Sequence, residues 1–289
     1  MESQIKLHGF DPKDALIEVE PRDLSNKIIE KDDIINMIKK HGSSVALIMF
    51  SGVQYLSGQF FDIKAISKAA REVGALVSFD FAHAIGNVPI HLEEWDIDFA
   101  VWCTYKYLNS GPGSVGGFYV NRRHHENILK GKGNILAGWW GVDLKKRFLM
   151  KHEFEPYEGA RAFQQSCTSI FNTCGVLASL ESFKKMNVEV VRQRSFKLTE
   201  YFRELFEKSG LKDKIRIITP REKERSGAQI SLAFPDRDST IETFIGLSAL
   251  GVITDRREPD IIRLTFAGLY NSYQDVFSTI EALKHLLIK

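Results

Sequence analysis

Two apolar stretches that each end in ionisable residues constrain the fold of this chain more than any other feature. Residues 77–83 form an apolar run that delivers Asp80 and His83, and residues 99–103 form a second apolar run that is soon followed by Lys106. The separation between Asp80 and Lys106 suits the ends of two neighbouring strands rather than one face of a helix. We therefore expect an acid, a histidine and a lysine to meet at one edge of a β-sheet.

Apolar strands alternate with amphipathic helices through the first part of the chain. We predict strands over residues 45–50, 76–79, 99–103 and 117–120, and helices over residues 33–40 and 62–73. This alternation predicts an α/β fold with a mostly parallel sheet and helices on both faces. Ligands of such sheets bind beyond the carboxyl ends of the strands. Ser51, Asp80 and Lys106 all fall at such ends, which indicates one shared site.

The pattern changes in the second part of the chain. Residues 173–209 read as helix, broken near Asn187. Beyond them we predict short strands over residues 216–218, 228–234, 252–254 and 261–266, covered by helices over residues 239–250 and 274–287. This mixture predicts a smaller C-terminal α+β domain. We divide the chain into a large domain over residues 1–175 and a small domain over residues 176–289.

Charge and cysteine content exclude several classes of protein. The net charge is +2 with 26% charged residues, and no run of lysine and arginine suggests a nucleic-acid groove, so we expect no nucleic-acid partner. No apolar run approaches membrane-spanning length, and the first residues lack the apolar core of a signal peptide. The three cysteines, Cys103, Cys167 and Cys174, lack the spacing of a metal site. We expect reduced thiols, a cytoplasmic location and no bound metal.

A buried carboxylate near a buried lysine suits pyridoxal phosphate chemistry. The lysine forms a Schiff base, and the acid keeps the pyridine nitrogen protonated so that the ring accepts electrons. Taken alone, Lys106 would be an ordinary surface lysine and Asp80 a turn residue. However, Lys106 follows Trp102 and precedes Leu108, which keep it from bulk water, so we expect desolvation to lower its pKa. His83 has either a structural role or a place beside the cofactor ring.

Other motifs leave two interpretations open or fail in context. Arg263 lies in an apolar strand, where an unpaired guanidinium is costly, so it should meet a carboxylate. That carboxylate belongs either to an internal ion pair or to a substrate. The glycines of residues 111–116 match G-x-G-x-x-G, but a strand rather than a helix follows them, which argues against a dinucleotide-binding loop. Trp139 and Trp140 are by default packing residues.

Together these residues resemble the kynureninase family of fold-type I pyridoxal phosphate enzymes. The matching stretches are residues 50–55, 79–87, 98–109, 138–141, 251–257 and 263–272. The resemblance implies hydrolysis of L-kynurenine, or its 3-hydroxy form, to anthranilate, or 3-hydroxyanthranilate, and L-alanine. Such a reaction belongs to tryptophan catabolism and to pyridine nucleotide (NAD) biosynthesis.

The resemblance also implies roles for residues of the cofactor site. Lys106 matches the Schiff-base lysine, which also carries the substrate α-proton. Asp80 matches the partner of the pyridine nitrogen, and His83 matches a residue beside the ring. Ser51 and Tyr105 match contacts on the phosphate side, and Tyr105 also provides general acid–base help.

Two further residues extend the site beyond the cofactor. Arg263 matches the arginine that binds the substrate carboxylate. Trp139 matches a tryptophan that the other subunit of a homodimer contributes to a shared site. Cys167 stands where the family often has an asparagine that contacts the aromatic side of the substrate, which leaves the preference for the hydroxylated substrate open.

The resemblance further implies that an N-terminal portion of the large domain is absent. Residues 1–9 resemble a segment well inside that domain, after the phosphate-binding loop and the aromatic residue that stacks on the cofactor. Two alternatives therefore remain beside the hydrolase. One is another lyase of the same cofactor type, such as a cysteine-desulfurase-like enzyme, against which the Trp139 and Tyr270 segments argue. The other is a non-catalytic remnant that only pairs with a full-length homologue.

Overall fold

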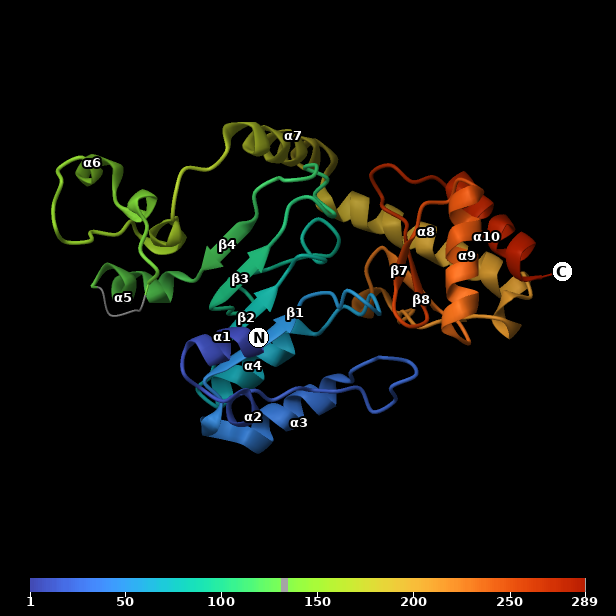
Figure 1. Cartoon of the computed structure of the whole chain (residues 1–289), viewed down its shortest axis with the longest axis horizontal. Coiled ribbons are helices and arrows are strands. Elements are labelled where there is room, and N and C mark those ends of the chain that lie inside the picture. The colour runs from blue at the N-terminus through green and yellow to red at the C-terminus, as the bar shows by residue number, and fades with distance from the viewer. Residues whose placement is uncertain (131–134, 289) are drawn as a thin grey trace.

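The chain builds two β-sheets, each with its own helices (Figure 1). The computed structural model describes residues 1–130 and 135–288. The helices are α1 (Glu2–Leu7), α2 (Pro12–Ala15), α3 (Lys31–His41), α4 (Ile63–Glu72), α5 (His125–Leu129), α6 (Leu144–Arg147), α7 (Ile170–Met186), α8 (Val188–Lys208), α9 (Arg237–Ala249) and α10 (Tyr273–Leu287). Within these described residues, no helix combines the length and the apolar character that crossing a bilayer requires.

The first sheet is mixed but mostly parallel. It contains β1 (Leu47–Ser51), β2 (Leu76–Asp80), β3 (Phe99–Trp102) and β4 (Gly117–Val120), in that order. The first three strands run parallel and β4 is antiparallel to β3. In the register, Ser51 lies opposite Asp80, and Asp80 lies opposite Val101. The predicted strands and the predicted α/β architecture are therefore confirmed.

Helices α3 and α4 cover one face of this sheet. The Asp62 side chain accepts a hydrogen bond of 3.0 Å from the Ala65 amide and so caps α4. The apolar side of α4 then packs with α3 against alternate residues of the strands; this core includes Ile34, Ile38, Ile63, Ile66, Ala69, Val77, Phe79 and Ala100. Because these side chains recur with helical spacing on α4 and with a period of two in β2, both elements bury one face.

The other face of the first sheet is less well covered than the sequence predicts. The register places Leu47, Met49, Leu76 and Val101 together on this face, and all four are exposed. In the described part of the chain, α1 and α2 bury none of their own residues. Helices thus pack closely on one face, and these four side chains of the other face are exposed in the described residues.

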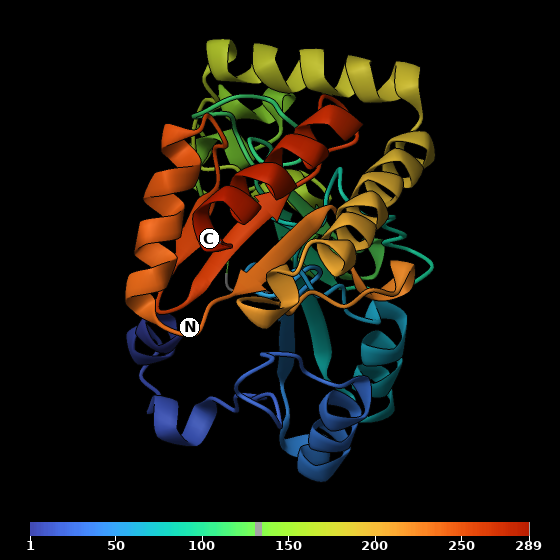
Figure 2. The same cartoon turned by 90° about the vertical axis from the view of Figure 1, so that its right-hand side faces the viewer.

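The second sheet is antiparallel and packs under α8, α9 and α10 (Figure 2). It contains β5 (Arg216–Ile217), β6 (Gln229–Ala233), β7 (Asp255–Arg257) and β8 (Ile261–Thr265), in the order β5-β6-β8-β7. The predicted break at Asn187 is confirmed, since α7 ends at Met186 and α8 begins at Val188. The predicted strand over residues 252–254 is wrong, because the strand begins three residues later, at Asp255. The division at residue 175 stays a prediction.

The loop after β1 joins the two sheets. Gln229 of β6 donates hydrogen bonds to the carbonyl oxygens of Tyr55 and Leu56 at 3.0 and 3.2 Å. The hydroxyl groups of Thr219 and Ser231 donate to the Ser57 and Leu56 carbonyl oxygens, both at 2.6 Å. These buried contacts hold the loop against the second sheet, so residues at the carboxyl end of β1 face residues of β6 and β8.

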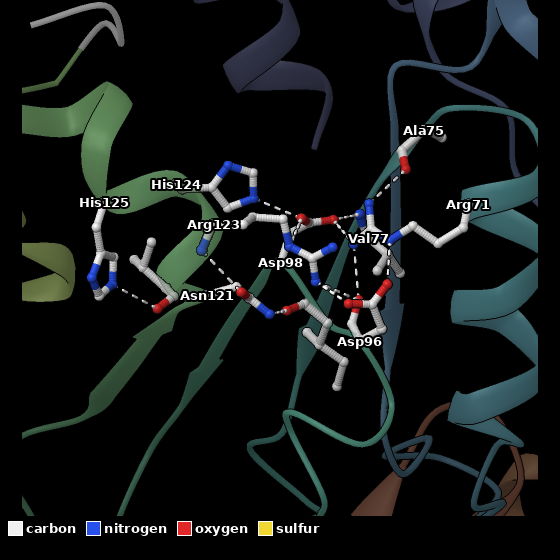
Figure 3. A network of polar contacts seen from close by, with 11 residues as sticks. Arg71, Ala75, Val77, Asp96, Asp98, Asn121, Arg123, His124 and His125 are labelled. Atoms are coloured by element: carbon white, nitrogen blue, oxygen red, sulfur yellow. Dashed lines mark hydrogen bonds and ion pairs between the residues drawn. The ribbon is translucent and has the colours of Figure 1, made fainter. Parts of the chain in front are cut away.

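A buried polar network holds the opposite, amino-terminal end of β3 (Figure 3). The Asp98 side chain is 0% exposed and lies beside Arg71, Arg123 and His124. Its oxygens accept hydrogen bonds of 2.8 Å from the Val77 amide and 2.6 Å from His124 Nε2. The network ties α4, β2 and the segment after β4 together at the end of the sheet remote from Lys106, so its role is structural.

Replacing Asp98 with alanine should therefore destabilise the fold strongly. The substitution leaves Arg71, Arg123 and the Val77 amide without their buried acceptor, and breaking such a group costs about 3–5 kcal/mol of unfolding free energy. Urea unfolding followed by circular dichroism measures this change. Glu94→Ala is the matched control, because the Lys64–Glu94 pair is exposed and should have little effect. Equal urea midpoints for the two variants would contradict the structural role.

Candidate active site

Lys106 lies in the turn that follows β3, and its amine is held by two neighbours. Lys106 Nζ donates a hydrogen bond of 3.2 Å to Cys103 Sγ and one of 3.5 Å to Tyr105 Oη. The amine also lies 4.9 Å from the centre of the Tyr105 ring. In the described part of the chain Lys106 is in none of the ion pairs, so its amine is directed by a thiol and a phenol rather than by a carboxylate.

The direction of the pKa shift of Lys106 differs from the sequence-based expectation. Burial lowers the pKa of Lys106, as expected. The hydrogen bonds to Cys103 and Tyr105 raise it, and their combined effect is larger, so the pKa of Lys106 is raised overall. The expectation of a lowered pKa is wrong for this chain by itself. Both acceptors stabilise the ammonium form, and the apolar sequence pattern around Lys106 gave no sign of them.

A short chain of contacts links Lys106 to Asp80. The Asp80 carboxylate accepts a hydrogen bond of 2.7 Å from the Ala82 amide, which fixes the turn after β2. The carbonyl oxygen of Ala82 in turn accepts the Cys103 thiol at 3.6 Å, and Cys103 is the residue that holds the Lys106 amine. Asp80, the Cys103 thiol and the Lys106 amine therefore gather at the carboxyl ends of β2 and β3. Ser51 lies beside them, since it pairs with Asp80 in the register.

His83 is mostly buried beside the same group. Its ring meets the Tyr107 ring edge to face, with 6.1 Å between the centroids. Asn87 fixes its backbone, because Asn87 Nδ2 donates to the His83 carbonyl oxygen at 2.9 Å while Asn87 Oδ1 accepts the Ala228 amide at 2.8 Å. His83 Nδ1 is buried and has no hydrogen-bond partner among the described residues. A buried ring nitrogen without a partner indicates a place for a ligand atom.

The surroundings of His83 keep its ring neutral. Burial lowers the pKa of His83 most, and the positive charges of Lys106, Arg263 and Arg257 lower it further, to about 4. The same charges show that the imidazole of His83 lies within electrostatic reach of Lys106 from the first sheet and of Arg263 from the second. At neutral pH the site therefore holds a neutral imidazole among cations.

The low pKa of His83 predicts a loss of stability in mild acid. Below pH 6.5 the unfolded chain takes up a proton at His83 that the folded chain resists until the pH nears 4, so stability falls through this window and is unaffected above it. Between pH 7 and pH 5 the loss from this one group should be about 2 kcal/mol. Urea unfolding of His83→Gln at both pH values should show a smaller acid effect by that amount.

His8→Gln is the matched control for this prediction. His8 is exposed just after α1, so its removal should leave the whole acid effect of the parent chain in place. If His83→Gln and His8→Gln lose the same stability between pH 7 and pH 5, His83 is not the buried neutral group described above.

Arg263 of β8 meets a carboxylate, as the sequence predicts. Its Nη2 forms an ion pair with Asp255 of β7, and its Nη1 donates a hydrogen bond of 2.6 Å to the Tyr55 carbonyl oxygen. Burial lowers the pKa of Arg263, while Tyr107 and Tyr55 raise it, and the net shift is downward. Arg263 Nε is buried and has no partner among the described residues. The internal ion pair is therefore present, and part of the guanidinium remains available.

The other two predicted residues lie at the edge of this group or apart from it. Tyr105 is 51% exposed, and its hydroxyl lies 3.5 Å from the Lys106 amine. Trp139 is 55% exposed and packs against Phe148, with 5.5 Å between ring centroids. Its segment contacts α6, which lies in an arm at the left of Figure 1, away from the carboxyl ends of β1, β2 and β3. The chain does not bring Trp139 to its own Lys106.

Four neighbours of the site were not identified as site residues from the sequence. The sequence predicts only a reduced thiol for Cys103 and assigns no role to Tyr107. Asp255 and Arg257 fall within a stretch that carried the resemblance, but nothing in its pattern assigned them a contact. If residues 261–265 form a strand, Arg263 needs a residue opposite it on a neighbouring strand. The segment at Asp255, which directly precedes this strand in the sequence, was the nearest candidate.

A cavity lies elsewhere, beside the helices of the covered face. A space of about 580 Å³ opens between α3, α4 and the segment at Arg225, and its lining includes Ile34, Phe61, Ile63 and Trp95. None of the residues predicted for the site lines this space. We therefore place the candidate active site at Lys106, where the predicted site residues gather.

Known proteins resemble the chain in sequence and in fold. Residues 191–283 match the family model described as the kynureninase C-terminal domain. The chain is 43% identical to a kynureninase of Coccidioides immitis (strain RS) over 97% of its own length and 60% of that protein. It is 42% identical to a kynureninase of Yarrowia lipolytica (strain CLIB 122 / E 150), over 98% of its own length and 67% of that protein. The chain thus spans about three fifths to two thirds of the length of these relatives.

A solved structure supports the same fold at a greater distance. The apo structure of a cysteine desulfurase from Thermococcus onnurineus NA1 covers 99% of the chain with a TM-score of 0.78, and the chain covers 68% of that structure. The sequence identity is 15%, so this likeness concerns the fold alone. It supports the predicted α/β fold of the fold-type I class.

Proposed function

Because this chain belongs to the kynureninase family, we propose that it provides the pyridoxal phosphate site of a hydrolase that cleaves L-kynurenine or 3-hydroxy-L-kynurenine. The products are anthranilate or 3-hydroxyanthranilate and L-alanine, in tryptophan catabolism and pyridine nucleotide biosynthesis. One observation carries the proposal: the Lys106 amine, Asp80 and His83 gather at the carboxyl ends of two parallel strands. That is where ligands bind in such sheets.

The residues present fit pyridoxal phosphate. His83 Nδ1 is a buried polar atom without a partner, and the Lys106 amine meets no carboxylate in the described residues. Asp80 uses one oxygen for the Ala82 amide and is in none of the described ion pairs, so its charge is free to pair with a cationic ring nitrogen. We propose that Lys106 binds the aldehyde, Asp80 binds the pyridine nitrogen and His83 lies against the ring. Ser51 and Tyr105 are proposed for the phosphate side.

When bound, the cofactor supplies an electron sink for the bonds at the substrate α-carbon. The chain supplies proton transfer and orientation. Lys106 Nζ accepts and returns the α-proton, and the contacts with Cys103 and Tyr105 hold this nitrogen in place during the transfer. Tyr105 Oη lies within reach of the same nitrogen and is exposed, so it can pass a proton between solvent and the site.

The second sheet orients the substrate. Arg263 enters the site from β8, and its guanidinium retains N–H groups for the α-carboxylate. The neutral imidazole of His83 adds no positive charge beside Lys106, so the cation of Arg263 is the group that selects an anionic substrate end. The contacts between the loop after β1 and β6 hold the two halves of the site at a fixed separation.

Trp139 supports a shared site in a homodimer. Its ring is 55% exposed on an arm that lies away from the Lys106 of the same chain. We propose that this arm reaches the site of a second copy. Trp139→Ala should then weaken cofactor or substrate binding without changing the fold of its own chain. A cytoplasmic location completes the proposal, and the free thiols of Cys103, Cys167 and Cys174 agree with it.

Fluorescence of the released anthranilate tests the function. The purified chain is titrated with pyridoxal phosphate while the absorbance of the bound cofactor is followed, and L-kynurenine is then added. The proposal expects a cofactor band and a growing anthranilate signal. L-cysteine as substrate tests the cysteine-desulfurase-like alternative, for which sulfide release without anthranilate is expected. Absence of any cofactor band, with association to a full-length homologue, would instead support the non-catalytic alternative.

A further inference from the structure

The guanidinium of Arg263 is held at one end by two fixed acceptors. Its Nη1 donates to the Tyr55 carbonyl oxygen at 2.6 Å, and its Nη2 pairs with Asp255. Tyr55 belongs to the loop that Gln229 clamps to the second sheet, and Asp255 belongs to β7, directly opposite Arg263 in the register. Other contacts therefore fix the backbone of both Tyr55 and Asp255.

The contacts with Tyr55 and Asp255 do not use all the N–H groups of Arg263. A guanidinium carries five N–H groups in one plane, one on Nε and two on each Nη. The contacts with Tyr55 and Asp255 use one on each Nη. Arg263 Nε is buried and has no partner among the described residues. Nε and Nη2 form one edge of the guanidinium plane, and a carboxylate can accept N–H groups of such an edge in bidentate fashion.

The charges around Asp255 leave a place for one more anion. The second carboxylate oxygen of Asp255 accepts Arg257 Nη1 at 2.7 Å, so one carboxylate serves two arginines. Two positive charges and one negative charge leave one positive charge uncompensated in a half-buried setting. On the first sheet His83 is neutral and Lys106 is cationic, and the Asp80 carboxylate is the proposed partner of the pyridine nitrogen. A substrate carboxylate would supply it.

We propose that Asp255 is a positioning residue that fixes the Arg263 guanidinium so that its Nε side faces the substrate α-carboxylate. This inference rests on the proposed function and adds the residue that sets the preference for carboxylate-bearing substrates. Asp255 touches neither the reacting atoms nor the cofactor. It acts through Arg263, and Arg257 keeps the Asp255 side chain in place by occupying its other oxygen.

A comparison of two ligands separates positioning from general stability. L-kynurenine and the corresponding amine that lacks the α-carboxylate are titrated into the cofactor-loaded parent chain, Asp255→Ala and Asp255→Asn. In Asp255→Ala the affinity for L-kynurenine should fall by about 10- to 100-fold, the range for one or two hydrogen bonds to a charged group. The affinity for the amine should be nearly unchanged. Asp255→Asn, which keeps an oxygen acceptor, should recover part of the loss.

Glu258→Ala is the matched control. Glu258 lies three residues from Asp255 and also pairs with two arginines, Arg237 and Arg256, but it does not contact Arg263. Its removal should leave both affinities at the parent values. An equal loss of affinity for L-kynurenine and for the amine in Asp255→Ala would overturn the proposal, because a merely structural role affects both ligands alike.

Nuclear magnetic resonance of the arginine side chains tests the same inference without cofactor or catalysis. In the parent chain the two Nη groups of Arg263 should give separate signals, since Tyr55 and Asp255 prevent rotation of the guanidinium. These signals should merge in Asp255→Ala and stay separate in Glu258→Ala. Separate signals in Asp255→Ala would overturn the proposal, whatever the outcome for the proposed function. A parent chain that shows separate signals but binds neither ligand would mean that the proposed function fails while Asp255 still positions Arg263.

Discussion

Replacing Lys106 with alanine is expected to abolish both the absorbance band of the amine-linked cofactor and the release of anthranilate. The alanine side chain has no amine to bind the aldehyde and no nitrogen to carry the α-proton. Lys106 Nζ is also the atom that Cys103 and Tyr105 hold, and no other lysine has these contacts in the described residues. The absorbance spectrum with added pyridoxal phosphate and the fluorescence assay measure the two losses.

Lys64→Ala is the control for this expectation. Lys64 lies on the exposed side of α4, and its amine pairs with the Glu94 carboxylate at 2.9 Å. This variant should retain the band and the turnover of the parent chain. Retention of both by Lys106→Ala would refute the assignment of Lys106, and with it the site described above.

Replacing Asp80 with asparagine is expected to leave cofactor attachment in place but to lower turnover by about a thousandfold. Two unit charges about 4 Å apart interact by roughly 4 kcal/mol at an effective dielectric constant of about 20. That energy corresponds to roughly three pKa units on the ring nitrogen, which decides whether the ring is protonated at neutral pH. Asparagine still accepts the Ala82 amide through its side-chain oxygen, so the turn after β2 should persist.

Asp62→Asn is the matched control for the charge change. Asp62 caps α4, a role that asparagine also performs well, and its carboxylate pairs with Lys31 at 3.4 Å. Its turnover should equal that of the parent chain. If Asp80→Asn keeps full turnover while its far-ultraviolet circular dichroism is unchanged, Asp80 does not hold the ring nitrogen.

The main strands and helices were predictable because their residues repeat with a simple period. The strand over residues 117–120 was predicted with its observed bounds, and the carboxyl ends of β1, β2 and β3 lie within one residue of the prediction. Apolar runs bounded by turn residues produce this accuracy. Part of the site was predictable for the same reason. Ser51 and Asp80 were expected at neighbouring strand ends, and they do lie opposite each other.

The prediction failed where pairing rather than periodicity forms the element. The strand β7 consists of Asp255, Arg256 and Arg257, which carry no apolar pattern. Its backbone pairs with β8, and the ion pair between Asp255 and Arg263 crosses the two strands. The sequence therefore predicted that Arg263 needs a carboxylate, but it did not identify which one.

Electrostatic detail was the least predictable part of the site. Desolvation of Lys106 was expected from its apolar neighbours, yet the net pKa shift depends on the positions of Cys103 Sγ and Tyr105 Oη. The shift of His83 depends on arginines more than 170 residues later in the chain. Such contacts exist only after the two sheets pack against each other. Trp139 shows the same limit, because its proposed partner surface belongs to another copy.

Peptide mapping after reduction with sodium borohydride tests the central claim most directly. The reagent fixes pyridoxal phosphate permanently on the amine that binds it, and mass spectrometry then locates the modified residue. The account predicts that the added mass falls on Lys106 alone at stoichiometric cofactor. Modification of a different lysine, or an even spread over several surface lysines, would contradict it.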